Sequence, residues 1–475
     1  MKVRKNMRNP HPKYMCYPSV VPTCEKTEVT VFPRDISRVF SEDKQYSLLV
    51  IGMCDDLPDY HVSLPFDVPC RVENGCLKFT YTFEKEQEYS IRFKEGDKKE
   101  IRIPMYALER DLYELRPLKC EFHTHSYYSD GGDGAAMVAA DYREEGFDSF
   151  ALTDHNRMFT SELLPSLYDG IPLGISMLHG EEVHTPGSKL HIVHIGGSYS
   201  VCEKYIKHRE QFEKDVAEIE KTIMDVSEQY RYRLASAIWS CREIKKAGGV
   251  SIFAHPFWKS NIYNVSSEFC DLLFDAKIFD VFELFNGANT HLDNLQLSLW
   301  LEQIQKGNVL PVVASSDSHN HDFGKDGFAR SFTVVFAKDN TSESIKTAVK
   351  NGMGVAAEIS RDADEDIRFY CSSHRLVALS RFLWDNYFNE TWRLCVGEGI
   401  LMRRHAEGED VSTALAALAD TVENFYNRFY GKTKVDGLSK DRLEFLDTLR
   451  KAQRDSGLKT KGSSLEIYGG NECRE

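Results

Sequence analysis

Residues 120–133 read CEFHTHSYYSDGGD and join the end of an apolar run to two histidines and a polar turn. Successive side chains of a strand alternate between its two faces, so His123 and His125 would project from the same face. The turn through Gly131 and Gly132 would bring Asp130 back toward the histidines. The stretch therefore predicts a strand that ends in a pair of imidazoles, as one part of a larger polar site.

The same pattern recurs from residue 116 to residue 360, where short apolar runs end in polar residues and helical segments lie between them. The runs are LKCEFHTH, FDSFALTDH, ISMLHGEE, LHIVHIGG, GGVSIFAHP, FDVFELFN, NVLPVVASSDSH and RSFTVVFA. Strands that alternate with helices predict a parallel α/β sheet or barrel. Such folds build their sites at the C-terminal ends of the strands, which is where the polar residues stand.

The regions on either side have different patterns. Residues 27–115 alternate apolar and polar side chains between Pro, Gly, Asp and Asn turns, which is typical of a small β-sandwich, and the residues after 361 favour helices. A chain of 475 residues is expected to form two or three domains. We assign a β-sandwich-like domain, an α/β domain and a helical C-terminal region to residues 1–115, 116–360 and 361–475.

A charged, periodic segment at residues 203–247 interrupts the α/β part and ends at two glycines. It predicts one long helix or a pair of helices. The segment is interpreted as a solvated or partner-packing insertion, with a lid over the site as the alternative.

Composition and charge limit the kinds of partner. The net charge of −14 disfavours a broad basic surface for nucleic acid and favours a small-molecule substrate. The twelve cysteines contain no C-x-x-C pair, so reduced thiols are expected. No segment has the pattern of a signal peptide or a membrane span, and we therefore expect a cytoplasmic protein without a membrane association. The sequence identifies no protein partner.

Histidines are concentrated in the α/β region, which holds twelve of the sixteen in the chain, from His123 to His321. Most of them stand beside a carboxylate at the end of a predicted strand. The polar residues at these ends are His123, His125, Asp130, Asp154, His155, Glu181, Glu182, His191, His194, His255, Glu283, Asp317 and His319. Neutral imidazoles and carboxylates are ligands of Zn, Mn and Fe, and repetition at successive strand ends predicts a multinuclear metal site.

The order of the motifs FHTHSYYSDG, TDHN, GEE, HIVHIGG, AHP and SDSH resembles the PHP family, the polymerase and histidinol phosphatase metal-dependent hydrolases, over about residues 117–360. The N-terminal β-domain also resembles that of PHP members related to carbamate-cleaving enzymes. The resemblance implies a distorted (β/α)7 barrel of TIM-barrel-like form with two or three divalent ions at the strand ends. It further implies three ligand groups: His123, His125 and Asp317 for the first ion; Glu182, bridging to a second ion held by His191 and His255; and Asp130, His155 and His319 for the third.

Three positions qualify this transfer of ligands. Glu121 stands where the family usually has an aspartate, which matters little if the residue supports a ligand rather than being one. The Gly-x-Glu spacing favours Glu182 over Glu181. In HIVH the resemblance favours His191, but His194 would face the opposite side of the strand and would become the ligand if the register slipped by one residue.

Other residues near the motifs have two interpretations. Glu283 in FELFN either supports a metal ligand or is an ordinary carboxylate at a strand end. We interpret His179, His184 and His321 either as hydrogen-bond donors that support the ligands or as exposed side chains. Arg157 and Arg330 are the nearest candidates for binding a phosphate, since a guanidinium matches two phosphate oxygens, although each also fits an ordinary surface arginine.

The motifs favour hydrolysis without a protein nucleophile. Divalent metals lower the pKa of a bound water from 15.7 toward about 7 and neutralise the charge that develops on the transferred group. There is no G-x-S-x-G motif, P-loop or dinucleotide fingerprint. We therefore predict a metal-dependent phosphoesterase that acts on a small phosphorylated substrate or a nucleotide through metal-bound hydroxide. The alternatives are a carbamate or amide hydrolase with the same metals and a noncatalytic, metal-stabilised module that binds a partner.

Overall fold

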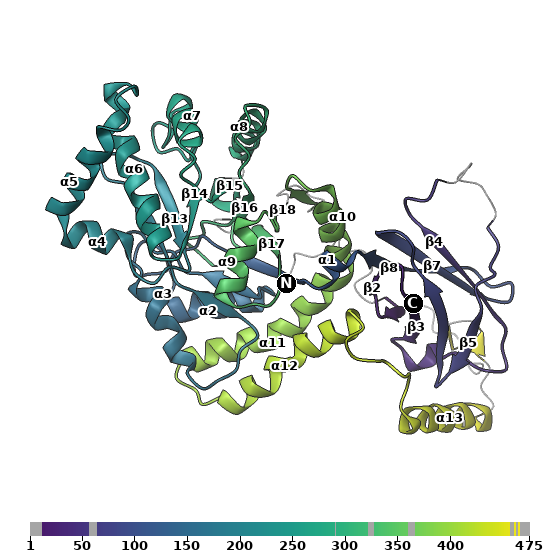
Figure 1. Cartoon of the computed structure of the whole chain (residues 1–475). Helices are drawn as coiled ribbons and strands as arrows, with labels where there is room; N and C mark the ends of the chain where they lie inside the picture. Colours follow the sequence, from purple (N-terminus) through teal and green to yellow (C-terminus); the bar gives the residue numbers. More distant parts are fainter. Residues whose placement is uncertain are drawn as a thin grey trace, which may run out of the picture. The chain divides into compact units, whose positions relative to one another are not determined.

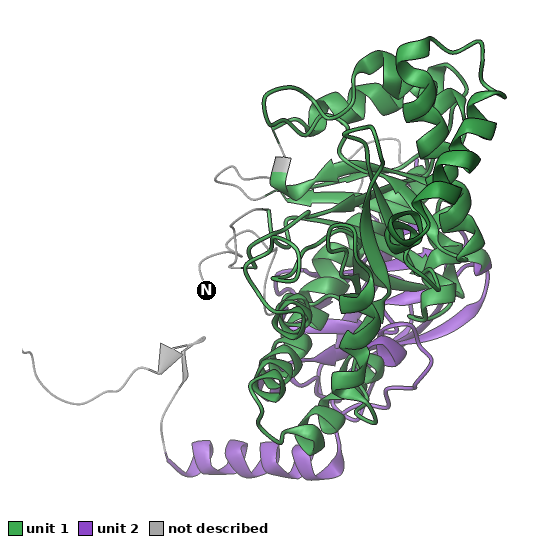
Figure 2. Ribbon diagram, turned by 90° about the vertical axis from the view of Figure 1, so that its left-hand side faces the viewer, with its two compact units in different colours: residues 1–8, 111–425 green, residues 9–110, 426–475 purple. Residues whose placement is uncertain are grey.

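The computed structural model describes residues 12–56, 64–289, 291–321, 327–359 and 366–456, together with the two-residue strands β20 (Thr460–Lys461) and β21 (Ser464–Leu465). These residues divide into two compact units (Figure 2). The first comprises residues 111–425, and the second comprises residues 12–110 and the described residues from 426 onward. The second unit is therefore built from both ends of the described chain.

The first unit contains two β-sheets flanked by helices (Figure 1). In spatial order, the six-stranded sheet has β11 (Ser176–Leu178), β10 (Ser149–Ala151), β9 (Arg116–Glu121), β17 (Ser331–Ala337), β18 (Gly354–Ile359) and β19 (Ile367–Tyr370). The five-stranded sheet has β12 (Gly180–His184), β13 (His191–Ile195), β14 (Val250–Phe253), β15 (Val281–Asn286) and β16 (Val312–Ser315). The fold of this unit is mixed α/β, as the alternation of strands and helices predicts.

The strands are not all parallel, in contrast to the expectation from the sequence. The pairs β9–β10, β10–β11, β14–β15 and β15–β16 are parallel, whereas β13 is antiparallel to both of its neighbours and β17 is antiparallel to β9 and β18. The reason at β12 and β13 is the short connection through residues 185–190. A turn of this length reverses the chain, while a parallel pair needs a crossover of a dozen residues or more.

The two sheets of the first unit meet at isolated bridges beside the polar strand ends. Only residue 179 separates β11 from β12, although the two strands belong to different sheets. A parallel bridge joins His155, which follows β10, to Glu182 in β12. A second parallel bridge joins Thr124, which follows β9, to Ser318, which follows β16. The residues at the ends of these strands are thereby brought to one place.

Helices connect and cover the strands. Their bounds are α1 (Arg110–Tyr113), α2 (Ala135–Glu144), α3 (Phe159–Leu163), η2 (Leu164–Tyr168), α4 (Val201–Lys207), α5 (Arg209–Glu220), α6 (Glu228–Lys246), α7 (Ser267–Asp275), η3 (Gly287–Asn289), α8 (Asp293–Gln305) and α9 (Ser342–Lys350). Serine or threonine side chains cap the N-termini of α4, α7 and α9. Buried apolar side chains fill the space inside the sheets and under the helices, among them Val281, Val335, Phe253 and Trp239. Each such side chain contributes about 1.5–3 kcal/mol to folding.

The segment from 203 to 247, for which the sequence predicts one long helix or a helical pair, lies in the three helices α4, α5 and α6. Phe212 of α5 packs edge-on against Trp239 of α6, with ring centroids 4.8 Å apart. The chain leaves α6 through Gly248, whose φ of 75° is the left-handed conformation common after a helix C-terminus. The apolar sides of these helices belong to the core of the first unit.

The helices after residue 366 are divided between the two units, which differs from the single C-terminal region expected from the sequence. The first unit takes α10 (His374–Leu383), η4 (Trp384–Phe388), α11 (Asn389–Ala406) and most of α12 (Ser412–Phe429), and the second unit takes α13 (Lys440–Asp455). A buried ion pair fixes α11 on α2, because Nε of Arg143 lies 2.7 Å from Glu398. Composition shows that a segment is helical, but it does not show which body the helix packs against.

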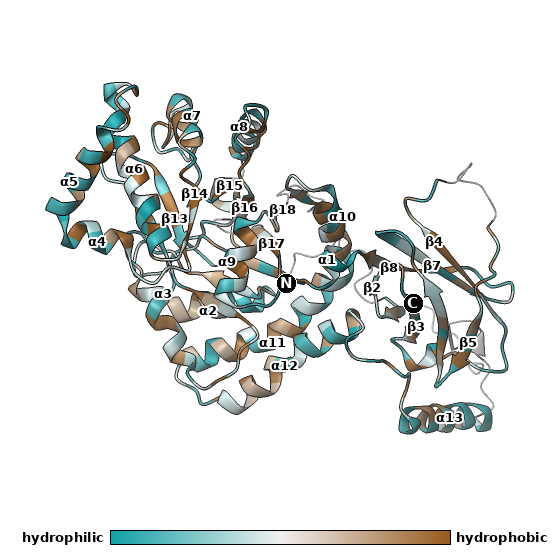
Figure 3. Ribbon diagram, in the orientation of Figure 1, coloured by the Kyte–Doolittle hydropathy of each residue, from teal (hydrophilic) through white to brown (hydrophobic). Residues whose placement is uncertain are grey.

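The second unit has two four-stranded sheets around a common apolar core. One has β1 (Tyr14–Tyr17), β3 (Lys26–Pro33), β6 (Cys76–Thr82) and β5 (Cys70–Glu73), and the other has β2 (Val20–Pro22), β8 (Ile101–Leu108), β7 (Gln87–Glu95) and β4 (Tyr46–Gly52). Alternate residues of β7 are buried, including Tyr89, Ile91 and Phe93. The short helix η1 (Ile36–Arg38) contacts α13, which is largely hydrophilic and buries Leu446 (Figure 3). None of the described helices is long and apolar enough to cross a bilayer.

Candidate metal centre

The strand ends of both sheets in the first unit contribute to one cluster of imidazoles and carboxylates. His123 and His125 follow β9, His155 follows β10, and the other sheet supplies residues within or just after β12, β13, β14 and β16. The side chains gathered there are His123, His125, Asp130, His155, Glu182, His191, His255, Asp317 and His319. All nine ligands expected from the sequence therefore lie in connected contacts.

Glu182 lies at the centre of the cluster and is completely buried. Its two carboxylate oxygens are surrounded by five imidazoles. The nitrogens of His155, His123 and His125 lie 2.7, 3.3 and 3.4 Å from Oε2, and those of His191 and His255 lie 2.7 and 3.1 Å from Oε1. Burial acts to raise the pKa of Glu182, but the imidazoles, His191 foremost, hold it well below its usual range. The carboxylate is therefore in the ionised form that a metal requires.

Asp317 provides a second buried carboxylate. Its Oδ1 lies 3.2 Å from Nε2 of His123 and 3.0 Å from Nε2 of His125, so both histidines of the H-x-H motif face the same oxygen. Its Oδ2 accepts a hydrogen bond from Asn286 at 3.3 Å. Burial opposes ionisation, yet the neighbouring histidines, His123 first, lower the pKa of Asp317. The backbone of Asp317 has φ of 51°, a conformation that few residues other than glycine adopt and that is often found at functional sites.

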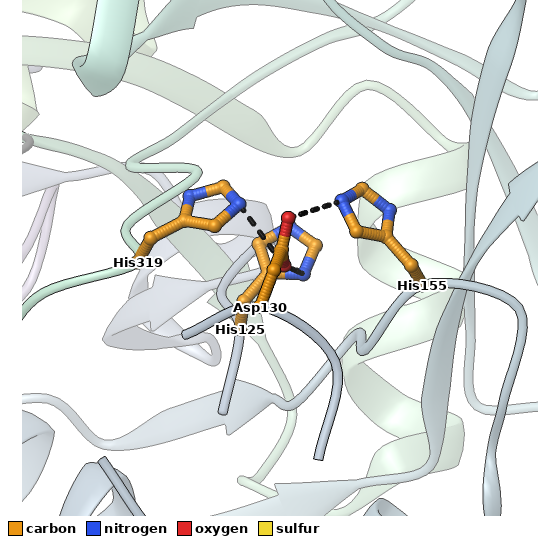
Figure 4. A group of neighbouring side chains, drawn as sticks. All are labelled: His125, Asp130, His155 and His319. Carbon is orange, nitrogen blue, oxygen red and sulfur yellow. Dashed lines mark ion pairs between the residues drawn. The ribbon is translucent and has the colours of Figure 1, made fainter. Parts of the chain in front are cut away.

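An outer cluster is formed by His125, Asp130, His155 and His319 (Figure 4). Asp130 lies between the rings, with Oδ2 3.3 Å from Nε2 of His155 and Oδ1 3.3 Å from Nε2 of His319. The side chain of Asp130 is 51% exposed, so this cluster opens toward solvent, unlike the one around Glu182. His125 reaches both clusters, because its other nitrogen, Nδ1, lies 3.8 Å from Asp130.

The carboxylates change the proton affinity of the outer histidines. Burial acts to lower the pKa of His155, but Glu182 and Asp130 raise it to about 10. The pKa of His319 is likewise lowered by burial and raised by Asp130, with the net result of about 8. In the metal-free protein both rings therefore hold protons that a metal would have to displace.

Three further carboxylates orient the cluster from behind. Glu283 lies with Oε1 3.0 Å from Nδ1 of His123, while its Oε2 accepts the backbone N–H of His255 at 3.0 Å. Asp154 accepts hydrogen bonds from Ser126, Ser129 and Thr160 and so fixes the turn between His125 and Asp130. Glu121 accepts the backbone N–H of His123 at 2.9 Å and that of Ser316 at 3.1 Å. These contacts favour the interpretation that Glu283 supports a metal ligand over the interpretation that it is an ordinary carboxylate at a strand end.

Neighbouring residues on β12 and β13 separate into an inner and an outer face. Glu182 and His191 contact each other in the cluster, with 2.7 Å between Oε1 and Nδ1. Glu181 and His194 form a second buried pair on the other face, with 3.0 Å between Oε1 and Nδ1. Glu181 also accepts the hydroxyl of Ser200 and the N–H of Val201 at the start of α4. The register therefore places His191, and not His194, beside Glu182.

His184 belongs to the cluster more closely than the sequence analysis proposed. Its Nε2 lies 2.7 Å from Nδ1 of His155, and its ring stacks on His191 with centroids 4.1 Å apart. The signal was present in the sequence, since His184 follows Glu182 by two residues on the same strand and so shares its face. By contrast, His321 contacts Thr124 and Asp133, at 3.0 and 3.2 Å. His179 is half-buried, and its carbonyl accepts the N–H of residue 196.

The two arginines considered for phosphate lie in different environments. Arg157 is half-buried, and its guanidinium donates to the backbone carbonyls of His155, at 3.1 Å, and of Tyr128. These contacts hold it beside the outer cluster. Arg330 is half-buried at the end of the turn before β17, where its N–H donates to residue 327 and its carbonyl accepts from residue 359.

The chemistry of the inner cluster fits divalent metal. Nε2 of His123 and Oε2 of Glu182 are buried without a hydrogen bond, although each has several polar atoms within 3.4 Å. Buried polar atoms seldom lack partners, and a cation held among them would satisfy both. Mixed nitrogen and carboxylate donors suit Zn, Mn and Fe. The groups of close donors are therefore candidate sites for divalent ions.

Comparison with known proteins gives structural neighbours but no family model. No family model matches the chain. No curated protein matches it either. A two-domain protein from Bacteroides vulgatus, described as containing a PHP-like metal-dependent phosphoesterase, is 22% identical, with 51% of this chain and 65% of that chain covered and a TM-score of 0.36. The chain thus spans less than two thirds of that protein.

Two other solved structures are similar over part of the chain. A protein from Bifidobacterium adolescentis described as a metal-dependent phosphoesterase is 17% identical, with 42% of this chain and 87% of that chain covered and a TM-score of 0.31. An amidohydrolase from Chromobacterium violaceum, with bound sulfate and no metal, is 20% identical, with 44% and 89% covered and a TM-score of 0.30.

Proposed function

We propose that this chain is a metal-dependent hydrolase of the PHP type, and specifically a phosphoesterase for a small phosphorylated substrate or a nucleotide. The observation that carries the proposal is the position of Glu182, a buried, ionised carboxylate with five imidazoles within 3.4 Å. A structural role alone does not require so many ionisable groups in one buried place, where unpaired charge is costly. In the proposed fold the two sheets of the first unit close a distorted (β/α)7 barrel around this residue.

The proposed ligand sets are the three that the order of the sequence motifs implies. His123, His125 and Asp317 would hold the first ion, and Glu182 would bridge it to a second ion held by His191 and His255. Asp130, His155 and His319 would hold a third at the solvent-exposed side. Two or three Mn, Zn or Fe ions are proposed, and when bound they would supply Lewis acidity and an activated water.

The protein itself would orient the ligands and the substrate. Glu283 holds Nδ1 of His123 and thereby directs Nε2 into the inner cluster. Asp154 fixes the turn that carries Asp130. Arg157 would bind a phosphate oxygen at the exposed side, because a guanidinium has five N–H donors and its described bonds use Nε and one terminal nitrogen. Arg330 is proposed as the second phosphate-binding residue.

Phosphoester cleavage is favoured over carbamate cleavage by the cation beside the outer cluster. A phosphate monoester keeps two negative charges near neutral pH, and a guanidinium stabilises these through charge-assisted hydrogen bonds. A neutral carbamate has no comparable need for Arg157. Both reactions would use the same ligand sets.

The test begins with elemental mass spectrometry of the purified protein for bound metals. The same sample is then supplied with Mn²⁺ and assayed on p-nitrophenyl phosphate, nucleotides and an aryl carbamate. Two or three ions per chain with phosphate release are expected. Metal with carbamate cleavage alone would replace the phosphoesterase proposal by the carbamate hydrolase, and failure to bind metal even after reconstitution would refute both.

A matched pair of variants connects the activity to the cluster. His123→Ala is expected to lose metal and activity together while the far-ultraviolet circular dichroism is retained. His374→Ala, at an exposed histidine at the start of α10, is the control and is expected to keep both. A fully metallated and active His123→Ala protein would contradict the ligand assignment.

A further inference from the structure

Three aromatic side chains beside the outer cluster are exposed to solvent. Tyr127, Tyr128 and Phe159 are 72%, 49% and 39% exposed. Their rings form a chain of edge-to-face contacts, with centroids 6.1 Å apart from Tyr127 to Tyr128 and 5.9 Å apart from Tyr128 to Phe159. Covering the face of an aromatic side chain is favourable in free energy, and a group of exposed aromatic rings is typical of a binding site.

The backbone places these rings next to the candidate ligands. Tyr127 and Tyr128 lie between His125 and Asp130, and consecutive Cα atoms are about 3.8 Å apart, so the Cα of Tyr127 is within about 7.6 Å of that of His125. Phe159 begins α3, four residues after His155. The rings are therefore at the side of the site that is open to solvent, where the half-exposed Asp130 lies.

Hydrogen bonds hold this aromatic turn in one conformation. The N–H of Tyr127 donates to the carbonyl of Asp133 at 2.7 Å, and that of Tyr128 donates to the hydroxyl of Ser126 at 3.3 Å. The guanidinium of Arg157 donates to the carbonyl of Tyr128. A surface that is already ordered loses little conformational entropy when a ligand binds to it.

We propose that Tyr127, Tyr128 and Phe159 form a platform that binds a planar ring of the substrate, and that the substrate is therefore a phosphoester with a nucleobase or similar aromatic group. This inference rests on the proposed phosphoesterase function and narrows its substrate class. The ring would pack on the platform while the phosphate faces the outer cluster and Arg157. A sugar phosphate without a base would make only the second set of contacts.

The experiment compares two substrates that differ only in the base. The value of kcat/KM is measured with Mn²⁺ for adenosine 5′-monophosphate and for ribose 5-phosphate, and the ratio of the two values reports on the base. In the Tyr127→Leu/Tyr128→Leu protein the ratio is expected to fall about 5- to 150-fold, which corresponds to the ~1–3 kcal/mol of a base stacked on an aromatic side chain. In Tyr127→Phe/Tyr128→Phe, which keeps the rings, the ratio is expected to remain within about twofold, a range of less than ~0.5 kcal/mol.

Two controls exclude indirect effects. Metal content is measured for every variant, because the turn also carries Asp130. Phe445→Leu removes another exposed aromatic ring, 54% exposed on α13 of the second unit, and should not change the ratio. A ratio that is the same in the wild type, the Leu variant and the Phe variant would overturn the platform while leaving phosphoester hydrolysis intact.

Failure of the proposed function gives a different result, namely no phosphate release from either substrate by the metal-loaded protein. Calorimetric binding of adenosine to that protein then decides the inference. Binding that is lost in the Leu variant and kept in the Phe variant would support the platform, and the absence of binding, or equal binding by all three proteins, would overturn it.

Discussion

The substitution Glu283→Gln tests whether the carboxylate of Glu283 supports the metal ligands or only stabilises the fold. The Glu283 side chain is buried and accepts three hydrogen bonds, from Nδ1 of His123 at 3.0 Å, from the N–H of His255 at 3.0 Å and from Asn286 at 3.1 Å. Glutamine keeps the shape and one acceptor oxygen but replaces the other oxygen with a donor. We expect the amide oxygen to keep the two N–H donors and the new NH₂ group to face His123.

The magnitude follows from the bond to His123. A hydrogen bond to a charged group contributes about 1.5–3 kcal/mol, whereas one between neutral groups contributes about 0.5–1.5 kcal/mol. The loss is therefore about 1–1.5 kcal/mol. The NH₂ group also favours the tautomer of His123 with the proton on Nε2, the nitrogen that faces Glu182 and Asp317, which adds to the cost of metal binding. A total of about 2 kcal/mol corresponds to a Kd about 30-fold higher, within the 10- to 100-fold typical of such supporting residues.

The assay is a titration of the metal-free protein with Mn²⁺ against a chelating dye, and the control is Glu181→Gln. Glu181 is also buried, also lies 3.0 Å from Nδ1 of a histidine, His194, and also accepts two further hydrogen bonds, but it is on the outer face. Both variants are expected to lower the thermal midpoint, and only Glu283→Gln is expected to weaken metal binding. Equal Kd values for the two variants would refute the reasoning.

Three other changes test separate parts of the structure. His191→Ala is expected to weaken Mn²⁺ binding by more than about tenfold, and His194→Ala by less than about twofold, in the same titration; equal effects would contradict the register of β13. Asp130 raises the pKa of His319 to about 8 from 6.5, although burial lowers it, so the folded metal-free protein retains a proton that the unfolded chain loses in this range. As the pH increases from 6.5 to 8, the thermal midpoint of the metal-free wild-type protein, measured relative to that of His319→Gln, should therefore decrease, while its metal affinity should increase. An increase of this relative midpoint over the same pH range would contradict the reasoning. Glu398→Ala leaves the guanidinium of Arg143 buried without this carboxylate and should reduce the free energy of unfolding in urea by about 3–5 kcal/mol; a loss below about 1 kcal/mol would show that the pair does not fix α11.

Strand direction and helix packing are the parts of the fold that local patterns predict least well. Apolar runs with polar tips identify β9, β10 and β14 and their order, because burial of a strand is visible in its composition. Whether a strand is parallel to its neighbour depends on the length of the connection and on pairing between distant segments. The antiparallel pairing of β12 and β13 follows from the short turn between them. The packing of α11 on α2 depends on contacts between residues more than 250 positions apart, such as Arg143 with Glu398 and Arg403 with Asp141.

The side chains of the site were more predictable than the strands that carry them. The Gly-x-Glu spacing favours Glu182 over Glu181, the resemblance favours His191 over His194, and in the structure Glu182 and His191 contact each other. The period of two on a strand, applied to β12, would have placed His184 beside Glu182. The sequence predicts a turn that brings Asp130 back toward the histidines, but the hydrogen bonds from Ser126 and Ser129 to Asp154 that fix this turn join distant parts of the chain and could not be predicted.

The position of the cluster couples metal binding to the assembly of the two sheets. His123, His125 and His155 follow strands of the six-stranded sheet, whereas Glu182 and His191 lie in strands of the five-stranded sheet and His255 follows one of its strands. The bridge between His155 and Glu182 is itself a connection between the sheets. Without metal, the desolvation of these buried carboxylates and imidazoles opposes folding. An ion bound by residues of both sheets would offset this free energy and would link the two sheets. Since a ligand at 100 times its Kd stabilises the folded state by about 2.7 kcal/mol per site, the metal-loaded protein should unfold at a higher temperature as one body containing both sheets.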